Sequence, residues 1–175
     1  MLTNAQKPII GFAAYSGVGK TTLLKNLVPI FVSRGVRICL VKHAHHEFDV
    51  DKPGKDSYEL RKAGAGQVLI TSARRRALMM DNPVKKDPVL DDELTFLDQE
   101  SIDLILVEGF KHERFPRIEL FRQSLGHQPM YPEDDFIIAV ATDTELSVTP
   151  NIPMLDINDP TQIAGFIAKQ LKLAW

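Results

Sequence analysis

The chain has very little cysteine and no long hydrophobic run. Its 175 residues include one cysteine, Cys39, so an intrachain disulfide is excluded and a reducing compartment is expected. No apolar run approaches the roughly 20 residues that span a bilayer, and the first residues lack the apolar core of a signal peptide. We therefore expect a cytoplasmic protein with no membrane-spanning segment.

A strong charge of either sign is also lacking. The net charge is −2 at pH 7, which gives no basic field that would attract nucleic acid. The arginine run at residues 74–76 has no interleaved aromatic residues, so we expect either a solvated turn or a contact for an anion or an acidic partner. With 44% apolar residues, the chain can form one compact domain over residues 1–175.

Short apolar runs alternate with longer amphipathic segments along the chain. Strands are predicted over residues 8–15, 36–43, 103–110, 117–122 and 135–143, with a hairpin over 67–81. Helices are predicted over residues 20–34, 56–65, 87–98 and 159–175. This alternation is typical of an α/β fold, a three-layer sandwich around a largely parallel sheet. The polar residues 125–135 are expected to form a flexible surface loop.

The segment AAYSGVGKTT, residues 13–22, lies between the first predicted strand and the first predicted helix. It matches the phosphate-loop pattern G-x-x-x-x-G-K-[ST], except that Ala14 takes the first glycine position. Backbone N–H groups in such a turn, with a helix N-terminus behind them, form an anion site, and the fold is then P-loop NTPase-like. The predicted nucleotide-binding residues are Ser16, Gly17, Val18, Gly19, Lys20, Thr21 and Thr22.

A phosphate loop that binds Mg²⁺ needs an acidic group nearby, usually at the end of a neighbouring strand. The apolar segment DLILVEG offers Glu108 at its carboxyl end and Asp103 at its beginning. Because ligands bind at the carboxyl ends of strands in open α/β sheets, Glu108 is the better candidate. We predict that Thr21 and Glu108 hold the metal and that Lys20 and Glu108 are the catalytic candidates; a solvated carboxylate is the alternative for Glu108.

The densest polar cluster is VKHAHHEFDVDKPGKDS, residues 41–57, which follows the second predicted strand. Its side chains could contact a nucleotide or a phosphorylated substrate, could ligate a transition metal, or could form a solvated loop. No cysteine accompanies the histidines, and their spacing matches no standard structural zinc pattern. The residues considered are His43, His45, His46, Asp49 and Asp51, with Lys42, Lys52 and Lys55 as sources of positive charge.

The segment VATD closes the strand predicted over residues 135–143. GTP-binding proteins commonly place N/T-K-x-D at such a position, where the aspartate accepts hydrogen bonds from guanine. Only the aspartate of that pattern, Asp143, is present here. Asp143 is therefore a candidate for guanine recognition, and a role in a turn or as a helix cap is the alternative.

The segments SGVGKTTL, VKHAHHEFDVDKPGKDS, RKAGA and LVEGFK together resemble the molybdopterin-guanine dinucleotide biosynthesis adapter family, of the MobB type, over residues 9–143. The histidine-rich segment is the most specific part of the resemblance. The resemblance implies a GTP-binding protein of the P-loop class that uses Mg²⁺, has weak intrinsic GTPase activity and forms a homodimer. Such proteins assist the guanylyltransferase that joins GMP to molybdopterin, so that enzyme and molybdopterin are the implied partners.

The resemblance can be followed residue by residue. The phosphate loop matches the nucleotide-binding loop of the family, and Glu108, Gly109 and Lys111 match its E-G-F-K segment. The histidine-rich segment, with His43, Asp49, Asp51 and Lys55, matches a family signature to which the residues alone assign no role. The choice of guanine over adenine rests on the resemblance, because the N/T-K-x-D match is poor.

Two other functions remain open from the residues. In an autonomous small-molecule kinase, Asp49 or Asp51 would activate an acceptor hydroxyl. In a nucleotide-gated metal chaperone, His43, His45 and His46 would bind the metal.

Overall fold

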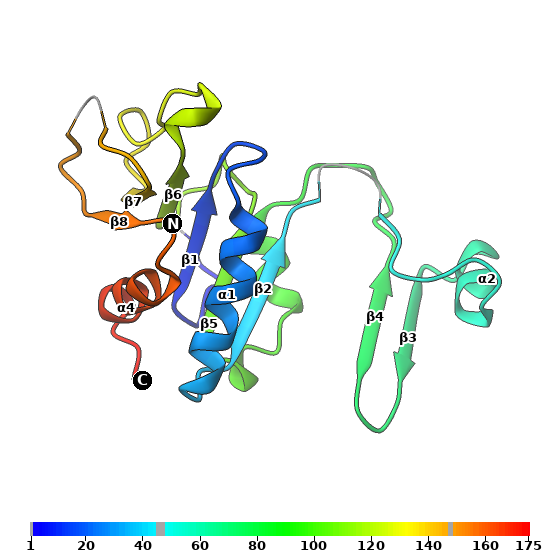
Figure 1. The fold of residues 1–175 in the computed structure, drawn as a ribbon. Helices are drawn as coiled ribbons and strands as arrows, with labels where there is room; N and C mark the ends of the chain where they lie inside the picture. The colour runs from blue at the N-terminus through cyan, green and yellow to red at the C-terminus, as the bar shows by residue number, and fades with distance from the viewer. Residues whose placement is uncertain (1, 45–47, 147–148) are drawn as a thin grey trace. The chain divides into compact units, whose positions relative to one another are not determined.

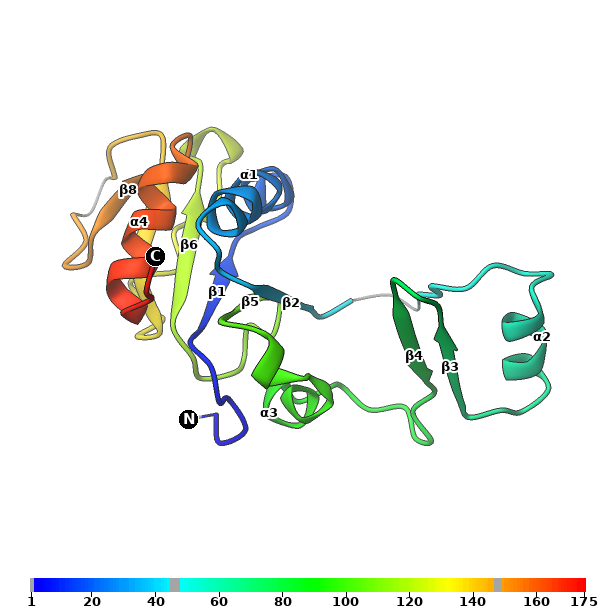
Figure 2. The same ribbon diagram turned by 90° about the horizontal axis from the view of Figure 1, so that it is seen from below.

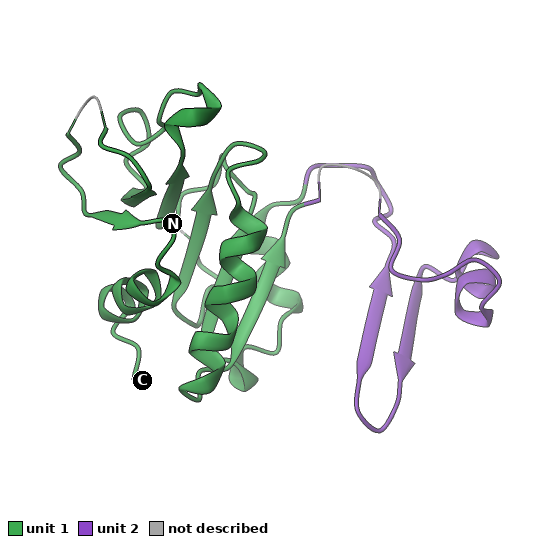
Figure 3. Ribbon diagram, in the orientation of Figure 1, with its two compact units in different colours: residues 1–43, 88–175 green, residues 44–87 purple. Residues whose placement is uncertain are grey.

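The computed structural model describes residues 2–44, 48–146 and 149–175. The chain divides into two compact units, residues 1–43 with 88–175 and residues 44–87, which are coloured separately in Figure 3. The single domain expected from the sequence stays a prediction.

The first unit is built on a six-stranded sheet with the order β2-β5-β1-β6-β7-β8 (Figure 1). All neighbouring strands in it are parallel. The strands are β1 (Ile9–Ala13), β2 (Ile38–Lys42), β5 (Leu104–Glu108), β6 (Arg117–Phe121), β7 (Ile137–Thr142) and β8 (Met154–Asp156). Because all six are parallel, their carboxyl ends lie at one edge. The phosphate loop follows β1 there, Glu108 is the last residue of β5, and Asp143 follows β7.

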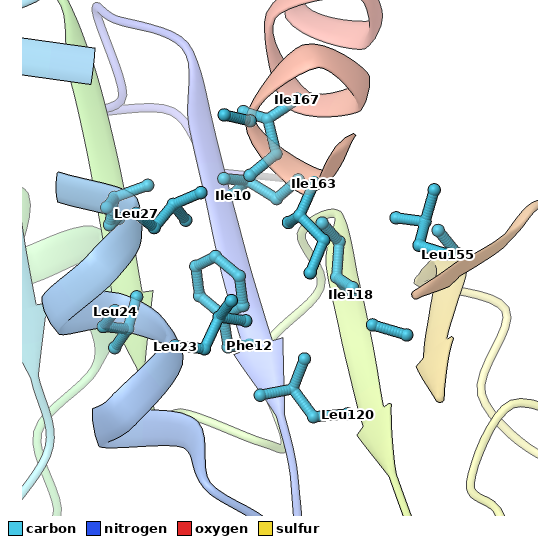
Figure 4. Packing of buried hydrophobic residues seen from close by; sticks show 14 of the residues in the cluster. Ile10, Phe12, Leu23, Leu24, Leu27, Ile118, Leu120, Leu155, Ile163 and Ile167 are labelled. Carbon is cyan, nitrogen blue, oxygen red and sulfur yellow. The ribbon is translucent and has the colours of Figure 1, made fainter. Parts of the chain in front are cut away.

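Helices cover both faces of this sheet, as Figure 2 shows. Helices α1 (Lys20–Ser33) and α4 (Pro160–Leu171) pack on one face, and Figure 4 shows their leucine and isoleucine side chains against β1 and β6. The short helix α3 (Leu90–Glu93) packs on the other face. In β5, Leu104 and Leu106 join the first core cluster while Ile105 and Val107 join the second. This explains why β5 reads as an unbroken apolar run.

The second unit contains helix α2 (Asp56–Lys62) and the antiparallel strands β3 (Gln67–Thr71) and β4 (Arg76–Met80). None of its described residues is buried. Leu69 and Leu78, paired across the hairpin, each expose more than half of their surface. This unit therefore has no hydrophobic core of its own among the described residues.

The architecture predicted from the sequence is confirmed: the sheet is parallel, helices flank it, and the hairpin lies over residues 67–80. The helix expected over residues 87–98 is wrong in extent. It reduces to α3 and one 3₁₀ turn, η1 (Leu94–Phe96), and a second 3₁₀ turn, η2 (Gln99–Ser101), follows it. The side chain of Asp91 accepts hydrogen bonds from the N–H groups of Thr3 and Asn4, and so holds the amino-terminal segment against α3. Strand β8 was missed because three residues give no periodicity.

No helix among the described parts of the chain is long and apolar enough to cross a membrane. The carboxyl-terminal helix begins as predicted, because the Asp159 side chain accepts hydrogen bonds from the N–H groups of Thr161 and Gln162.

Candidate functional site

The phosphate loop connects β1 to α1 in the way that the sequence predicts. Gly17 has φ +84° and Gly19 has φ +107°, a left-handed conformation that glycine adopts without strain. Lys20 begins α1, so the loop opens directly into the free N–H groups of a helix start. Ala14 is partly buried against the core, which explains why a methyl group is tolerated at the first glycine position.

The side chains of the loop divide between the core and the surface. Val18 is 3% exposed and belongs to the first core cluster, which anchors the loop beneath its turn. Ser16, Thr21 and Thr22 are exposed. The backbone is thus held from below while the hydroxyl groups remain accessible.

Glu108 lies at the carboxyl end of β5 and contacts the lysine of the phosphate loop. Its Oε1 is 3.5 Å from Lys20 Nζ, and its Oε2 is 3.4 Å from Lys42 Nζ. The Glu108 side chain is only 14% exposed. The structure therefore places one partly buried carboxylate between two ammonium groups, one of them from the loop.

Gly109 follows Glu108 in a tight turn. Its φ is +93°, and a Cβ added to it would lie 2.7 Å from His43 Cβ. The His43 N–H donates to the Glu108 carbonyl at 2.9 Å, and the His43 ring lies 5.0 Å from the ring of Phe110. His43 thus packs against the turn that carries Glu108.

Replacing Gly109 by alanine is expected to destabilise the protein more than replacing Gly126. Gly126 also has a positive φ, +71°, but nothing lies within 4 Å of its added Cβ. Gly126→Ala should cost about 1–2 kcal/mol of unfolding free energy from backbone strain alone. Gly109→Ala should cost clearly more, because the new methyl group must displace His43. Urea unfolding measures both, and equal costs would contradict the crowding at Gly109.

A buried arginine holds the next part of this turn. Arg117 is 3% exposed, and its guanidinium donates to the Lys111 carbonyl at 2.6 Å and to both carboxylate oxygens of Asp134 at 2.8 and 3.1 Å. The Lys111 side chain is exposed. Arg117 therefore fixes the backbone of the E-G-F-K segment from beneath, a contact that the sequence analysis missed.

The predicted surface loop at residues 125–135 is tied to the sheet by a second buried charge. Glu119 in β6 is fully buried, and its carboxylate accepts the N–H groups of Met130 and Tyr131 at 2.7 and 2.8 Å. The ring of His127 stacks on that of Tyr15 in the phosphate loop, with centroids 4.1 Å apart. This loop thus contacts the phosphate loop directly.

Burial raises the pKa of Glu119 above its ordinary value of 4.5, although the two N–H groups partly oppose the shift. A raised pKa in the folded state means that Glu119 contributes most to stability below about pH 4.5 and less as the pH rises through its folded pKa. The unfolding free energy of the native chain should therefore decline relative to that of Glu119→Gln as the pH rises above about 4.5. Urea unfolding across this range tests it, with the exposed Glu133→Gln as the control. A constant difference would contradict the raised pKa.

Asp143 follows β7 and is joined to Arg122, another residue that the sequence analysis did not single out. The guanidinium of Arg122 pairs with the Asp143 carboxylate, donates from Nε to the Val18 carbonyl at 3.1 Å, and donates to Asn158 Oδ1 at 2.9 Å. Both charged side chains are 28% exposed. Asp143 thus lies beside the phosphate loop, although Arg122 already binds one of its oxygens.

Two hollows adjoin this cluster. One, of about 390 Å³, is lined by Gly17, Gly19, Thr22, Arg122 and Asn158, among others. The other, of about 400 Å³, is lined by residues that include Asp143 and Asn158. Asn158 lines both hollows, so the two lie on either side of one residue.

The polar cluster after β2 is only partly described. His43 belongs to the first unit, and Asp49, Asp51 and Lys55 belong to the second, while His45 and His46 lie outside the described residues. Asp49 pairs with Arg61 and accepts the N–H of Asp51 at 3.0 Å. These two contacts lower the pKa of Asp49. Among the described residues, no group of three or more His, Cys, Asp or Glu side chains could hold a metal ion.

Comparison with known proteins gives one consistent result. A family model described as molybdopterin guanine dinucleotide synthesis protein B matches residues 9–143. The chain is 49% identical over 166 residues, 94% of each chain, to the molybdopterin-guanine dinucleotide biosynthesis adapter protein of Escherichia coli (strain K12). It is 42% identical over 168 residues to the adapter protein of the same name from Haemophilus influenzae, covering 96% of this chain and 92% of that one.

Solved structures show the same fold. A crystal structure of molybdopterin-guanine biosynthesis protein B superposes with a TM-score of 0.71 at 25% identity, covering 93% of this chain and 99% of that one. The MobB structure from Bacillus subtilis gives a TM-score of 0.72 at 21% identity, covering 95% and 99%. At 21% identity, the Bacillus subtilis structure supports the fold alone.

Proposed function

The chain belongs to the molybdopterin guanine dinucleotide synthesis protein B family, and on that premise we propose that it binds GTP with Mg²⁺ at the phosphate loop. As a member of this family it is an adapter in the biosynthesis of the molybdopterin guanine dinucleotide. We further propose that it assists the guanylyltransferase that joins GMP to molybdopterin, with molybdopterin as the second ligand. The lone thiol of Cys39 fits the expected cytoplasmic location.

One observation supports the proposal most strongly. The two glycines in the left-handed conformation lead directly into the start of α1, where the Lys20 side chain pairs with Glu108. The N–H groups from Ser16 to Thr22 would cradle the phosphates. Lys20 would leave its ion pair with Glu108 to reach the outer phosphates, where its charge is better compensated. The adjacent hollow of about 390 Å³ is large enough to receive part of a nucleotide.

The described residues also fit a magnesium ion. Mg²⁺ keeps several waters and takes one or two protein oxygens beside the phosphates, so it does not need a cluster of carboxylates. The exposed Thr21 hydroxyl and the Glu108 carboxylate are the proposed protein ligands. When bound, the metal would neutralise charge on the phosphate oxygens.

We propose that hydrolysis of GTP is weak. Glu108 is the carboxylate nearest to Lys20, and its charge is shared between Lys20 and Lys42. With Glu108 committed to the metal, no other carboxylate among the described residues pairs with Lys20 and could accept the proton of an attacking water. Lys20 would still stabilise the charge that develops on the phosphate. The chain would then act chiefly by binding and presenting the nucleotide.

The polar cluster is proposed to contact the nucleotide or the phosphate of molybdopterin. In the first unit His43 and Lys111 would supply hydrogen-bond donors and positive charge, and in the second unit Lys55 is proposed separately as a phosphate contact. Asp49 and Asp51 are proposed to shape the loop that carries Lys55. The lowered pKa of Asp49 makes it a poor proton acceptor, which argues against Asp49 as the base of the kinase considered from the sequence.

We also propose a homodimer that buries the hairpin of the second unit. Because that unit has no buried residue among those described, its exposed Leu69 and Leu78 need a partner surface to exclude water. Leu69→Lys should shift the chain from dimer to monomer in sedimentation experiments. Val32→Lys, at an exposed position of α1, should leave the dimer intact. A monomeric native chain, or a dimer unaffected by Leu69→Lys, would overturn this assignment.

The adapter role can be tested with the partner enzyme. Purified guanylyltransferase, GTP, Mg²⁺ and molybdopterin are mixed with and without the intact chain, and formation of the guanine dinucleotide is measured. We expect the native chain to raise the rate or yield and Lys20→Ala to raise neither. Equal stimulation by both proteins would contradict a role that depends on nucleotide binding.

A further inference from the structure

Arg122 connects three segments that are far apart in the sequence. It follows β6, and its guanidinium reaches the Val18 carbonyl in the phosphate loop, the Asp143 carboxylate after β7 and the Asn158 side chain before α4. Since the side chain is 28% exposed, this bridge is reachable from solvent. The same guanidinium therefore touches the proposed phosphate site and the two loops beside it.

The chemistry of arginine fixes the orientation of both partners. A guanidinium has donors and no acceptor, so the Asn158 amide must present its oxygen to Arg122, which leaves its Nδ2 group to donate elsewhere. The Oδ2 atom of Asp143 accepts a hydrogen bond from Arg122, and no described group donates to Oδ1 of Asp143. Arg122 thus leaves one acceptor, on Asp143, and one donor, on Asn158.

These two groups face the hollows beside the phosphate loop. Asp143 and Asn158 both line the hollow of about 400 Å³, and Asn158 also lines the neighbouring hollow with Gly17 and Thr22. A nucleotide whose phosphates occupy the loop could therefore extend its base toward this acceptor and donor. The base is the part of the nucleotide that differs between GTP and ATP.

An acceptor and a donor select guanine only when each is held opposite a particular position of the base. Guanine presents an acceptor at O6 and donors at N1–H and the 2-amino group, whereas adenine presents a donor at its 6-amino group and an acceptor at N1. We propose that Arg122 is a positioning residue for base selection, which holds Asp143 toward the guanine donors and Asn158 toward O6. This inference rests on the proposed nucleotide site and adds the residue that sets its preference for guanine.

The test compares affinities for GTP and ATP, measured by calorimetry with Mg²⁺, in the intact chain and in Arg122→Met. Methionine keeps the apolar stem but donates to neither partner, so Asp143 and Asn158 lose their fixed orientation. We expect the ratio of GTP affinity to ATP affinity to fall about 10-fold or more, while loss of the contact with the Val18 carbonyl lowers both affinities alike. A merely structural role would lower both affinities equally. An equal loss, or no loss, would overturn the proposal.

Two further variants test the assigned polarity. Asp143→Asn replaces an acceptor by a group that can donate to the 2-oxo group of xanthine, so XTP should gain on GTP by about 10-fold or more. Asn158→Asp removes the donor to O6 and should weaken GTP more than ATP. An unchanged XTP to GTP ratio in the first variant, or an unchanged GTP to ATP ratio in the second, would reject the respective contact.

A matched control is available in the same unit. Arg37 forms a similar exposed pair with Asp103, at the amino ends of β2 and β5 and thus at the opposite sheet edge. Arg37→Met should leave the GTP to ATP ratio unchanged. Lys20→Ala separates the two proposals, because it should abolish binding of all nucleotides. If Lys20→Ala binds normally the nucleotide site is wrong, whereas normal discrimination by Arg122→Met rejects only the base assignment.

Discussion

Lys20→Ala is expected to lower the affinity for GTP and Mg²⁺ by at least about 100-fold, because charge-assisted contacts to two phosphates contribute about 3 kcal/mol or more. Lys20 begins α1 at the end of the phosphate loop, where its ammonium group can reach the outer phosphates. Its loss also leaves Glu108 with Lys42 as its one described ion-pair partner, which adds negative charge where phosphates should bind. Calorimetric titration measures the effect.

The control for this variant is Lys25→Ala. Lys25 is exposed on the same helix, more than one turn further from the loop. Its replacement therefore removes the same charge from the helix surface without removing a phosphate contact. We expect an affinity within about threefold of the native value, since exposed charges are screened by salt. If Lys20→Ala bound GTP as well as Lys25→Ala, the assignment of residues 13–22 to the phosphates would be wrong.

Arg117→Met is expected to be the most destabilising change, with a loss of about 3–5 kcal/mol in the free energy of unfolding. Arg117 is 3% exposed, so its removal leaves the Asp134 carboxylate without its ion-pair partner and the Lys111 carbonyl without its donor. The N–H of Phe136 remains as a donor to Asp134. Methionine keeps much of the volume, which limits the contribution of a cavity. Urea unfolding with a fixed slope against denaturant gives the value.

Arg114→Met is the matched control for Arg117→Met, because Arg114 is exposed only three residues away. Its effect should stay within about 0.5 kcal/mol, as for other surface substitutions. A loss below about 1 kcal/mol in Arg117→Met would show that the buried ion pair contributes little net stability. In that case contacts other than those of Arg117 would have to stabilise the backbone after Glu108.

Local sequence patterns predicted the parts of the site that lie within a few residues of one another. The phosphate loop could be found because glycine, lysine and threonine must stand at fixed spacings between a strand and a helix. Glu108 could be found because it ends an apolar strand, and parallel strands bring their carboxyl ends to one edge. Both predictions use only the order of strands and helices along the chain, and neither depends on contacts between side chains that are far apart in the sequence.

The residues that the sequence analysis missed act across long separations. Arg122 and the Val18 carbonyl are 104 residues apart in the chain, and no local pattern reports such a pair. Arg117 and Glu119 alternate with apolar residues in RIELF, which is typical of a strand with one solvated face. They are buried instead, because β6 lies inside the sheet and residues of the following loop, Asp134 and Met130 among them, cover that face.

The role of the histidine-rich segment could not be predicted from its sequence. Its residues are specific enough to identify the family, yet their chemistry permits phosphate contact, metal binding or a plain loop. The structure shows that Asp49 is held by Arg61, a helix residue that the sequence analysis had not linked to it. The pairing explains why an acidic residue stands in this loop without any ligand being needed.

The most direct test of the nucleotide assignment is a calorimetric comparison of GTP and ATP with the intact native chain in the presence of Mg²⁺. We predict one class of site per chain that binds GTP more tightly than ATP, and a loss of GTP affinity when Mg²⁺ is chelated. ATP binding more tightly than GTP, or the absence of binding by either nucleotide, would contradict the proposed function.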